Sequence, residues 1–385
     1  MFNLQAKILL RSICAVFIIF LLISCRHTYS NKHENYESIN DFLLLNKDFD
    51  KNSHFLDLRF GNIYDLSGLE NLPDLVNLNL RANKIQDISN LKFLKKLDTL
   101  DMSFNNIQDI TNIQYLNELT ELDLSFNNIH DISPLKDLYK LESLSLTNNQ
   151  ISDIDAIGNL KSLRVLWLMN NKIKDITPLS NLKNLRFLII SDNEIADINI
   201  LKPSNIEVLG LSNNYITHLD NMHNLKRLED LEVGNNKISD IGNEMKCLTK
   251  LKRLSLHNNN ITDINSLKDL KSLEILHLSS NQIQDIEPLK YLTNLNVINL
   301  SNNRISNIKP LIILNNVERL YLFGNEISDI EPLTEMTFKK DKKIHIHIEK
   351  NPLNERSLTQ YINVLRKRNI YVYWNEDEIP LSMQD

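Results

Sequence analysis

A 22-residue repeat is the feature of this sequence that most constrains its fold. One copy begins at Leu75, and the next begins at Leu97 with leucine, methionine, asparagine, isoleucine and aspartate at the equivalent positions. A fixed period of this length predicts a solenoid in which each copy forms one turn. Gly61 and Asn351 mark the first and last copies at the position that asparagine holds elsewhere. The recurring asparagines are 22 residues apart except for one step of 21 and one of 23: Asn83, Asn105, Asn127, Asn149, Asn171, Asn193, Asn214, Asn236, Asn259, Asn281, Asn303 and Asn325.

Each copy combines a strand pattern with a turn pattern. The segment Leu-x-Leu has the two-residue period of a β-strand, which places both leucines inward. The apolar residues of the second half are three apart, which suits 3-10 turns. Burying about seven aliphatic side chains contributes ~1.5–3 kcal/mol each, while ordering the copy costs about 1 kcal/mol per residue, so only a stack of copies folds. The predicted fold class is an α/β repeat solenoid, an arch with a parallel β-sheet on its concave face and 3-10 or loop segments on its convex face.

Composition excludes several classes of protein. The 385 residues are 42% hydrophobic with only 7 glycines and 9 prolines, so a disordered chain is excluded. The net charge of −6 shows no basic excess, which argues against a nucleic-acid partner. The cysteines are Cys14, Cys25 and Cys247, with no Cys-x-x-Cys pair, so neither a disulfide framework nor a zinc site is predicted.

The first 24 residues have the pattern of a secretory signal peptide. Lys7 and Arg11 supply positive charge, and residues 12–23 form an apolar run. This run would rise only about 18 Å as a helix, well short of a ~30 Å hydrocarbon core, so a cleaved leader suits it better than a membrane-spanning helix.

The end of this leader, Leu22-Ile23-Ser24-Cys25, resembles the lipobox of bacterial lipoproteins. The resemblance implies cleavage before Cys25 and attachment of a diacylglycerol to its sulfur. Two or three acyl chains anchor a protein stably, because each buried methylene contributes about 0.8 kcal/mol. We therefore expect an extracytoplasmic, membrane-anchored lipoprotein, with surface and periplasmic placement both open. Ordinary secretion and an uncleaved anchor are the alternatives.

The ends of the repeat stack need caps to cover their apolar surfaces. Ser38, with Asp41 three residues later, predicts a capping box at the start of a short helix. At the other end, the pattern predicts a helix near Ser357–Lys367 and a strand that buries Trp374. The predicted segments are a leader over 1–24, a tether with a capping helix over 25–52, the repeats over 53–353, and a helix–strand cap with an acidic tail over 354–385.

The pattern Leu-x-x-Leu-x-Leu-x-x-Asn-x-Ile-x-Asp-Ile-x-x-Leu resembles the leucine-rich repeats of the internalin-like, 22-residue class, from about Ser53 to Leu353. Internalin-like proteins include host-cell adhesion and invasion factors, so the resemblance permits a host receptor as partner. The aspartate of the pattern invites a calcium interpretation. Ca²⁺ needs six to eight converging oxygens, so one carboxylate per turn fits a turn cap better, and His218 and Asn307 interrupt the column.

Specificity must lie in the strand residues that the repeat leaves free, and six apolar ones are predicted to form an exposed patch on the concave face. Exposed apolar patches of this size usually bind a partner, and tryptophan is enriched in interface hot spots. Acidic residues would form a charged rim on both sides. Neutral drift on a solenoid face is the alternative. The predicted partner-binding residues are Val165, Trp167, Met169, Phe187, Ile189 and Val208, with Glu121, Asp123, Asp230 and Glu232 as rim.

Other constellations are weaker. Tyr321 and Phe323 beside Arg319 are a second contact or part of the cap. Ser255 should lie beside His277, but no third group is readable that would orient a catalytic base, so catalysis is not predicted. His345 and His347 share a strand face, and two ligands do not make a zinc site. We predict no cofactor, no metal and a monomer.

The sequence thus predicts an envelope lipoprotein whose leucine-rich-repeat arch binds another protein. A structural or scaffolding envelope protein is the alternative. A phosphatase regulator built from similar repeats is a remote third possibility, opposed by the signal segment.

Overall fold

The computed structural model describes residues 36–199, 205–339 and 342–375. The predicted leader, Cys25 and the acidic tail lie outside the described residues. The chain divides into two compact units, which we describe separately. Within the described residues, the first unit runs to Lys172 and includes Leu188–Ile190, and the second comprises Ile173–Phe187 and the chain from Ser191 onward. Among these residues, no helix has the length and apolar character needed to cross a membrane.

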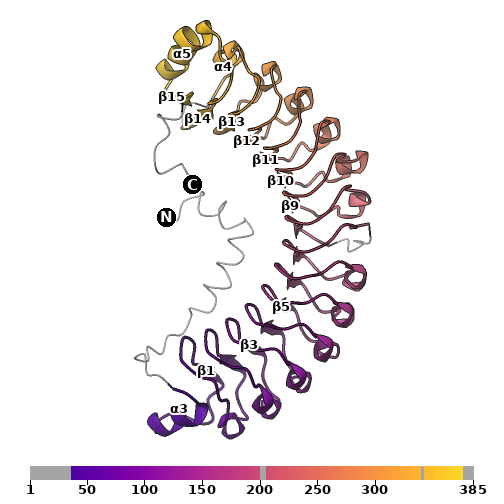
Figure 1. The fold of residues 1–385 in the computed structure, drawn as a ribbon, viewed down its shortest axis with the longest axis vertical. Helices are drawn as coiled ribbons and strands as arrows, with labels where there is room; N and C mark the ends of the chain where they lie inside the picture. The colour runs from indigo at the N-terminus through magenta and orange to yellow at the C-terminus, as the bar shows by residue number, and fades with distance from the viewer. Residues whose placement is uncertain (1–35, 200–204, 340–341, 376–385) are drawn as a thin grey trace. The chain divides into compact units, whose positions relative to one another are not determined.

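The first unit is a stack of repeats that each contribute one strand and one 3-10 turn. Neighbouring strands are parallel and in register, so that Leu100, for example, lies opposite Leu122. Within this unit the 3-10 helices lie on the side of the repeat away from the strands (Figure 1). The elements are α3 (Ile39–Leu45), β1 (Phe55–Asp57), η1 (Leu69–Asn71), β2 (Asn77–Asn79), η2 (Ser89–Phe93), β3 (Thr99–Asp101), η3 (Thr111–Tyr115), β4 (Glu121–Asp123), η4 (Ser133–Leu135), β5 (Ser143–Ser145), η5 (Asp155–Asn159) and β6 (Val165–Trp167).

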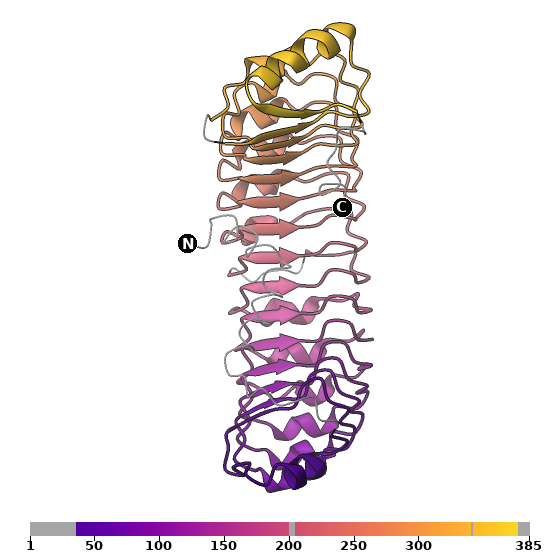
Figure 2. The same cartoon turned by 90° about the vertical axis from the view of Figure 1, so that its left-hand side faces the viewer.

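The second unit repeats this architecture and ends in a helix and a strand. Its strands run side by side in the same direction (Figure 2), and strand order is chain order. Strand β7 (Phe187–Ile189) has residues in both units. The other elements are η6 (Thr177–Asn181), β8 (Val208–Gly210), η7 (Met222–Asn224), β9 (Asp230–Glu232), η8 (Asn243–Cys247), β10 (Arg253–Ser255), η9 (Asn265–Asp269), β11 (Ile275–His277), η10 (Glu287–Tyr291), β12 (Val297–Asn299), η11 (Lys309–Leu311), β13 (Arg319–Tyr321), α4 (Glu331–Glu335), β14 (Ile344–His347), the π-helix η12 (Ser357–Tyr361), α5 (Ile362–Lys367) and β15 (Ile370–Tyr373).

The core of each unit consists of the recurring leucines and isoleucines. In the copy that begins at Leu75, all of them are at most 2% exposed: Leu75, Leu78, Leu80, Ile85, Ile88, Leu91 and Leu94. The middle residue of every three-residue strand is buried, while the first and third lie on the opposite face. The alternation predicted for Leu-x-Leu is therefore confirmed, and the predicted fold class, a parallel leucine-rich-repeat solenoid, is the one observed.

The recurring asparagines form the expected ladder. The amide of Asn105 donates to the carbonyls of Leu80 and Met102 at 3.0 and 3.1 Å, and its Oδ1 accepts from the backbone N–H of Ile85 at 3.0 Å. Asn127 makes the equivalent bonds one repeat later. Each side chain thus joins its own turn to the preceding one and satisfies backbone groups that would otherwise be buried without partners.

Two further devices close each turn. The residue before each asparagine has a positive φ, as at Phe104 and Phe126, which redirects the chain at the end of the strand. The recurring aspartate then accepts the N–H of the second residue after it: Asp109 Oδ1 lies 2.8 Å from the N–H of Thr111. Asn307 replaces the aspartate in one copy and makes the same bond at 3.1 Å. The aspartate column therefore caps turns, as the sequence indicated.

The capping segments are present at both ends of the described chain. Ser38 and Asp41 form the predicted capping box at the start of α3. At the other end, η12 and α5 together cover the predicted helix, and Arg368 binds the carbonyl of Thr334 at 2.6 Å. The expectation for Trp374 was wrong: strand β15 ends at Tyr373, and Trp374 is only half-buried.

Candidate protein-binding face

The candidate site is the strand face, which we define as the first and third residues of each three-residue strand together with the second residue after it. In β6, for example, these are Val165, Trp167 and Met169. In the four-residue strand β14 the equivalent residues are His345, His347 and Glu349. The leucines and isoleucines fill the core, the asparagines form the ladder and the aspartates cap the turns. The strand face is therefore a surface on which side-chain chemistry changes from one repeat to the next.

Carboxylates lie side by side on the strand face of the first unit. Asp101 on β3 is directly opposite Asp123 on β4. Burial, and after it the neighbouring charge of Asp101, raises the pKa of Asp123 to about 6, against the opposing effect of hydrogen bonds from Ser125. Glu121, at the start of β4, is exposed as a residue. Partial desolvation of its carboxylate raises the pKa of Glu121, and the nearby carboxylates of Asp98 and Glu142 raise it as well. Two of the predicted rim residues therefore belong to one acidic cluster.

The apolar residues of the first unit are less exposed than the sequence analysis expected. Trp167 is 7% exposed and Ile189 is 2% exposed, whereas Val165 and Met169 are half-buried. The N–H of Leu168 donates to the carbonyl of Ile189 at 2.8 Å, which places Trp167 and Ile189 on neighbouring strands. Because such strands are only about 4.8 Å apart, large side chains on one face cover each other. The prediction that both side chains are exposed was wrong.

The other two residues of the predicted patch, Phe187 and Val208, belong to the second unit. The carbonyl of Arg186 accepts a bond from the N–H of Val208 at 3.1 Å, so the two residues lie on adjacent segments. Both are half-buried. The guanidinium of Arg186 lies 5.8 Å from the ring centroid of Phe187 and also pairs with Glu207 at 2.7 Å. The predicted patch is thus divided between the two units.

The predicted acidic residues of the second unit lie together on β9. Asp230 is 6% exposed, and its Oδ2 is 3.4 Å from Nε of Arg253 on β10. Burial raises the pKa of Asp230 to about 7, opposed by Arg253 and reinforced by Glu232. Burial also raises the pKa of Glu232. Both acids were predicted as rim residues, but the pairing of Asp230 with Arg253 was not predicted, although the 23-residue offset between the strands places Arg253 opposite Asp230.

The serine and histidines of β10 and β11 do not form a catalytic arrangement. Ser255 lies opposite His277 in the register, as expected, but its hydroxyl is 2.9 Å from Nδ1 of His257, two residues later in the chain. The His257 ring occupies the space that a Cβ on Gly234 would need. Within the described part of the chain, no group of three or more His, Cys, Asp or Glu side chains is arranged to hold a metal ion.

A set of stacked rings on the last three strands was not predicted from the sequence. His347 stacks between Tyr321 and Tyr373, with ring centroids 4.8 and 4.4 Å apart, and His345 stacks on Tyr371 at 4.8 Å. The signal that could have predicted these stacks is the alternation of Tyr371 and Tyr373 on the final strand, which places one tyrosine opposite each histidine.

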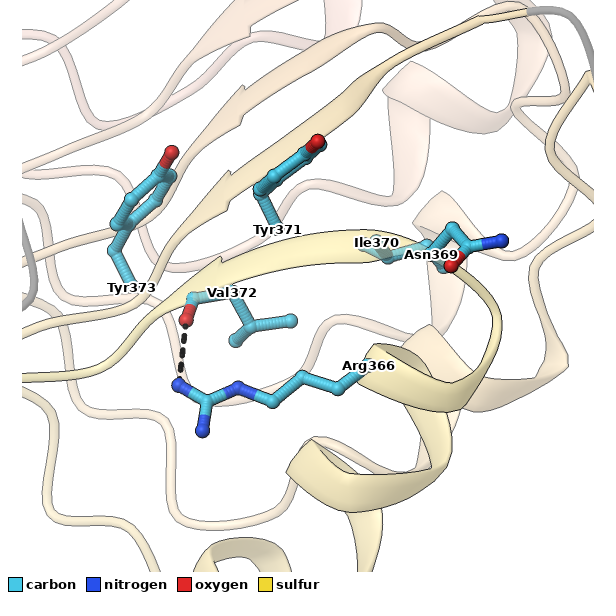
Figure 3. Close-up of a pocket in the computed structure, with 6 residues that line it drawn as sticks. All are labelled: Arg366, Asn369, Ile370, Tyr371, Val372 and Tyr373. Atoms are coloured by element: carbon cyan, nitrogen blue, oxygen red, sulfur yellow. Dashed lines mark hydrogen bonds between the residues drawn. The ribbon is translucent and has the colours of Figure 1, made fainter.

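A cavity of about 440 Å³ lies beside this last strand, lined by β15 and by Arg366 of α5 (Figure 3). The guanidinium of Arg366 donates to the carbonyl of Val372 at 3.4 Å. This bond occupies one backbone acceptor of β15, which is the last strand in the sheet order.

Comparisons with known proteins agree with this architecture. A family described as "Leucine Rich repeats (2 copies)" matches residues 95–137, 117–161, 139–181, 161–203, 249–291 and 293–335, and a second leucine rich repeat family matches 204–261. These matches cover more than half of the chain, and none is to a catalytic family. A search of curated proteins gave no significant match.

Solved structures give the same result. An internalin (InlF) from Listeria monocytogenes is 29% identical with a TM-score of 0.72, over 80% of this chain and 88% of that one. A leucine-rich repeat protein from Leptospira interrogans is 25% identical with a TM-score of 0.75, over 83% of each chain. The plant peptide hormone receptor RGFR1, solved in complex with RGF2, is 23% identical with a TM-score of 0.64, over 78% of this chain and 56% of that one, a likeness of fold alone. The chain therefore belongs to the leucine-rich repeat family, and an internalin is among the solved structures that it resembles.

Proposed function

We propose that this protein is a cell-envelope lipoprotein whose strand face binds a protein partner. One observation carries the binding part of the proposal. The recurring leucines, isoleucines, asparagines and aspartates are used by the core, the ladder and the turn caps, whereas the strand face presents a different set of side chains in each repeat. A surface that varies along an otherwise uniform scaffold is the expected location of specificity.

The strand face of the first unit offers the mixed chemistry of a protein interface. Apolar residues at β6, with Val165 and Met169 half-buried, lie on the same face as the carboxylates Glu121 and Asp123 of β4. Two short side chains of β5, Ser143 and Ser145, lie between them. Interfaces typically have an apolar centre and a polar rim, and the centre supplies most of the binding free energy.

The envelope part of the proposal is supported by the sequence of the leader. A short apolar segment followed by Leu22-Ile23-Ser24-Cys25 is the pattern of a lipidated protein. Attachment through Cys25 and a polar tether would hold the repeats close to a membrane while leaving the strand face accessible. The likeness to an internalin at 29% identity makes host adhesion one role that we propose for such a protein.

Site-specific photo-crosslinking in the cells that produce the protein tests the binding proposal. A photoreactive residue at Glu121 or Val165 reports on the strand face, and one at the exposed Asp155 of η5 is the matched control on the other side of the repeat. We expect a crosslinked protein of defined mass from the strand-face positions only. Equal crosslinking from both sides, or none from the strand face, would contradict the proposal, and a set of several envelope proteins would favour a scaffolding role.

A further inference from the structure

The strand face of the second unit contains a buried carboxylate that lacks a full set of partners. Oδ2 of Asp230 lies 3.4 Å from Nε of Arg253, but its Oδ1 has no hydrogen-bond partner and is inaccessible. The side chain as a whole is 6% exposed. A buried charged oxygen without a partner is costly, so structures retain one chiefly where a ligand, ion or water completes it.

The charges around Asp230 do not balance. Glu232 follows on the same strand and has no ion pair among the described residues, so two carboxylates face one guanidinium, that of Arg253. The histidines of the neighbouring strands do not supply the missing charge. Burial lowers the pKa of His277 to about 4 and also lowers the pKa of His257, which leaves both rings neutral at pH 7.

The remaining strand-face side chains near this cluster carry no charge. Strand β8 and the residue that completes its face contribute Val208, Gly210 and Ser212, and β11 contributes Ile275 beside His277. Gly210 lies directly opposite Glu232 in the register, so no side chain from β8 covers that carboxylate. The cluster is therefore a partly desolvated site in which two carboxylates share one guanidinium, and the residue opposite Glu232, Gly210, has no side chain.

We propose that Asp230 and Glu232 form a subsite for an arginine side chain of the partner protein. This inference rests on the proposed function and specifies the chemistry of the partner at one position. A guanidinium offers several N–H donors in a fixed plane, which suits a planar carboxylate better than a compact ammonium does. Glu232 is half-buried and has no ion pair among the described residues, so it can contact the incoming group directly. Asp230, two residues earlier on the same strand face, adds negative charge that its single Nε contact with Arg253 offsets only in part.

A proton should be released when the subsite fills. Asp230 has a pKa of about 7, so about half of the molecules carry a proton there at neutral pH. A bound guanidinium stabilises the ionised form and expels that proton. Binding should therefore tighten between pH 6 and pH 8, and the calorimetric enthalpy should depend on the ionisation enthalpy of the buffer.

The test uses small probes with the full chain, purified in detergent. N-acetyl-arginine amide is titrated calorimetrically, with N-acetyl-citrulline amide as the neutral probe of the same shape. We expect weak binding of the arginine probe with proton release, and at least about tenfold weaker binding of the citrulline probe. Equal binding of the two probes would overturn the proposal.

Variants localise the effect. Asp230→Asn and Glu232→Gln should each weaken binding of the arginine probe about tenfold or more. The matched control is Glu229→Gln, because Glu229 precedes Asp230 but pairs with Lys252 at 2.7 Å. Near-equal losses in Asp230→Asn and Glu229→Gln would also overturn the subsite. Circular dichroism of each variant checks that the fold is retained, and Asn and Gln are chosen because they preserve side-chain shape.

Failure of the subsite can be distinguished from failure of the proposed function. If photo-crosslinking captures a protein partner but Asp230→Asn leaves its capture unchanged, the protein-binding function stands and the arginine subsite falls. If no partner is captured but the arginine probe binds with proton release and loses affinity in Asp230→Asn, the subsite stands as a guanidinium site and the protein-binding function falls.

Discussion

At the scale of single residues, the ladder asparagines carry more of the fold than their size suggests. The amide of Asn105 donates to the carbonyls of Leu80 and Met102, and its oxygen accepts from the N–H of Ile85. We expect Asn105→Ala to lower the free energy of unfolding by at least about 2 kcal/mol, because it leaves buried backbone groups without partners. The adjacent Asn106 is exposed, so Asn106→Ala should change stability by no more than about 0.5 kcal/mol.

Urea unfolding of the two variants, followed by circular dichroism, compares them directly. Their side chains differ from alanine by the same atoms and are neighbours in the chain, so solvent and propensity effects are closely matched. A similar loss of stability in both variants would mean that the ladder hydrogen bonds contribute little more to stability than the hydrogen bonds to water that they replace.

A second prediction at this scale concerns the pH dependence of stability. The pKa of Asp230 is about 7 in the folded state, against 3.8 for an ordinary aspartate, so the folded protein binds more protons between these values. Stability from this group is therefore complete below pH 4 and is lost as the pH rises through 7. Asp230→Asn should be more stable than the native protein at pH 8, and it should show a smaller loss of stability between pH 5 and pH 8.

Denaturant midpoints measured at pH 5, 6, 7 and 8 check this expectation. Asp123, Asp101, Glu121 and Glu232 also have raised pKa values, so part of the pH dependence should remain in the variant. A variant less stable than the native protein at pH 8 would show that the ion pair with Arg253 outweighs the cost of burying the carboxylate.

At the scale of elements, the repeat unit could be predicted from sequence almost completely, because its signals are local. The two-residue period gives the strand, the three-residue spacing gives the 3-10 turn, and the Ser38–Asp41 pair gives the start of α3. The same local chemistry places each asparagine and aspartate. The prediction was less accurate beyond the repeats: the final strand was expected to include Trp374, but β15 ends at Tyr373.

The candidate site was less predictable, because it depends on which side chains cover one another across strands. Sequence spacing correctly placed Trp167 on the strand face, but it could not show that this face buries Trp167 and Ile189. It identified Asp230 and Glu232 as rim acids, but it did not reveal the ion pair between Asp230 and Arg253. Burial on a strand face is set by the sizes of three or four adjacent side chains from different repeats, and no single repeat contains that information.

The capping helix offers a prediction at this scale. Ser38→Ala removes the side chain that accepts the N–H of Asp41 at 3.0 Å. Loss of a capping serine costs about 1 kcal/mol, and α3 is short, so we expect its local opening to become several-fold more frequent. Hydrogen exchange should accelerate in residues 39–45, while the repeats around Asn127 keep their protection. Unchanged exchange in residues 39–45 would show that packing alone holds this helix.

At the scale of the whole molecule, a uniform scaffold is combined with two features that the repeat does not specify. The strand face varies along each unit and carries the proposed binding. The leader and Cys25 precede the repeats and carry the proposed anchor. These two functions are separable, because the anchor should set where the protein is located and the strand face should set what it binds. Variants of one should therefore leave the other unchanged.

The anchor gives the last prediction. Cys25→Ala removes the thiol that would carry the diacylglycerol, so metabolic labelling with a radioactive fatty acid should mark the native protein and not the variant. The matched control is Cys247→Ala, because Cys247 is a half-buried free cysteine of the second unit and should not be acylated. The control should label fully and fractionate with membranes, whereas the Cys25 variant should lose its label. An unlabelled native protein, or a labelled Cys25→Ala variant, would remove the lipid anchor and leave a secreted or differently tethered binding protein.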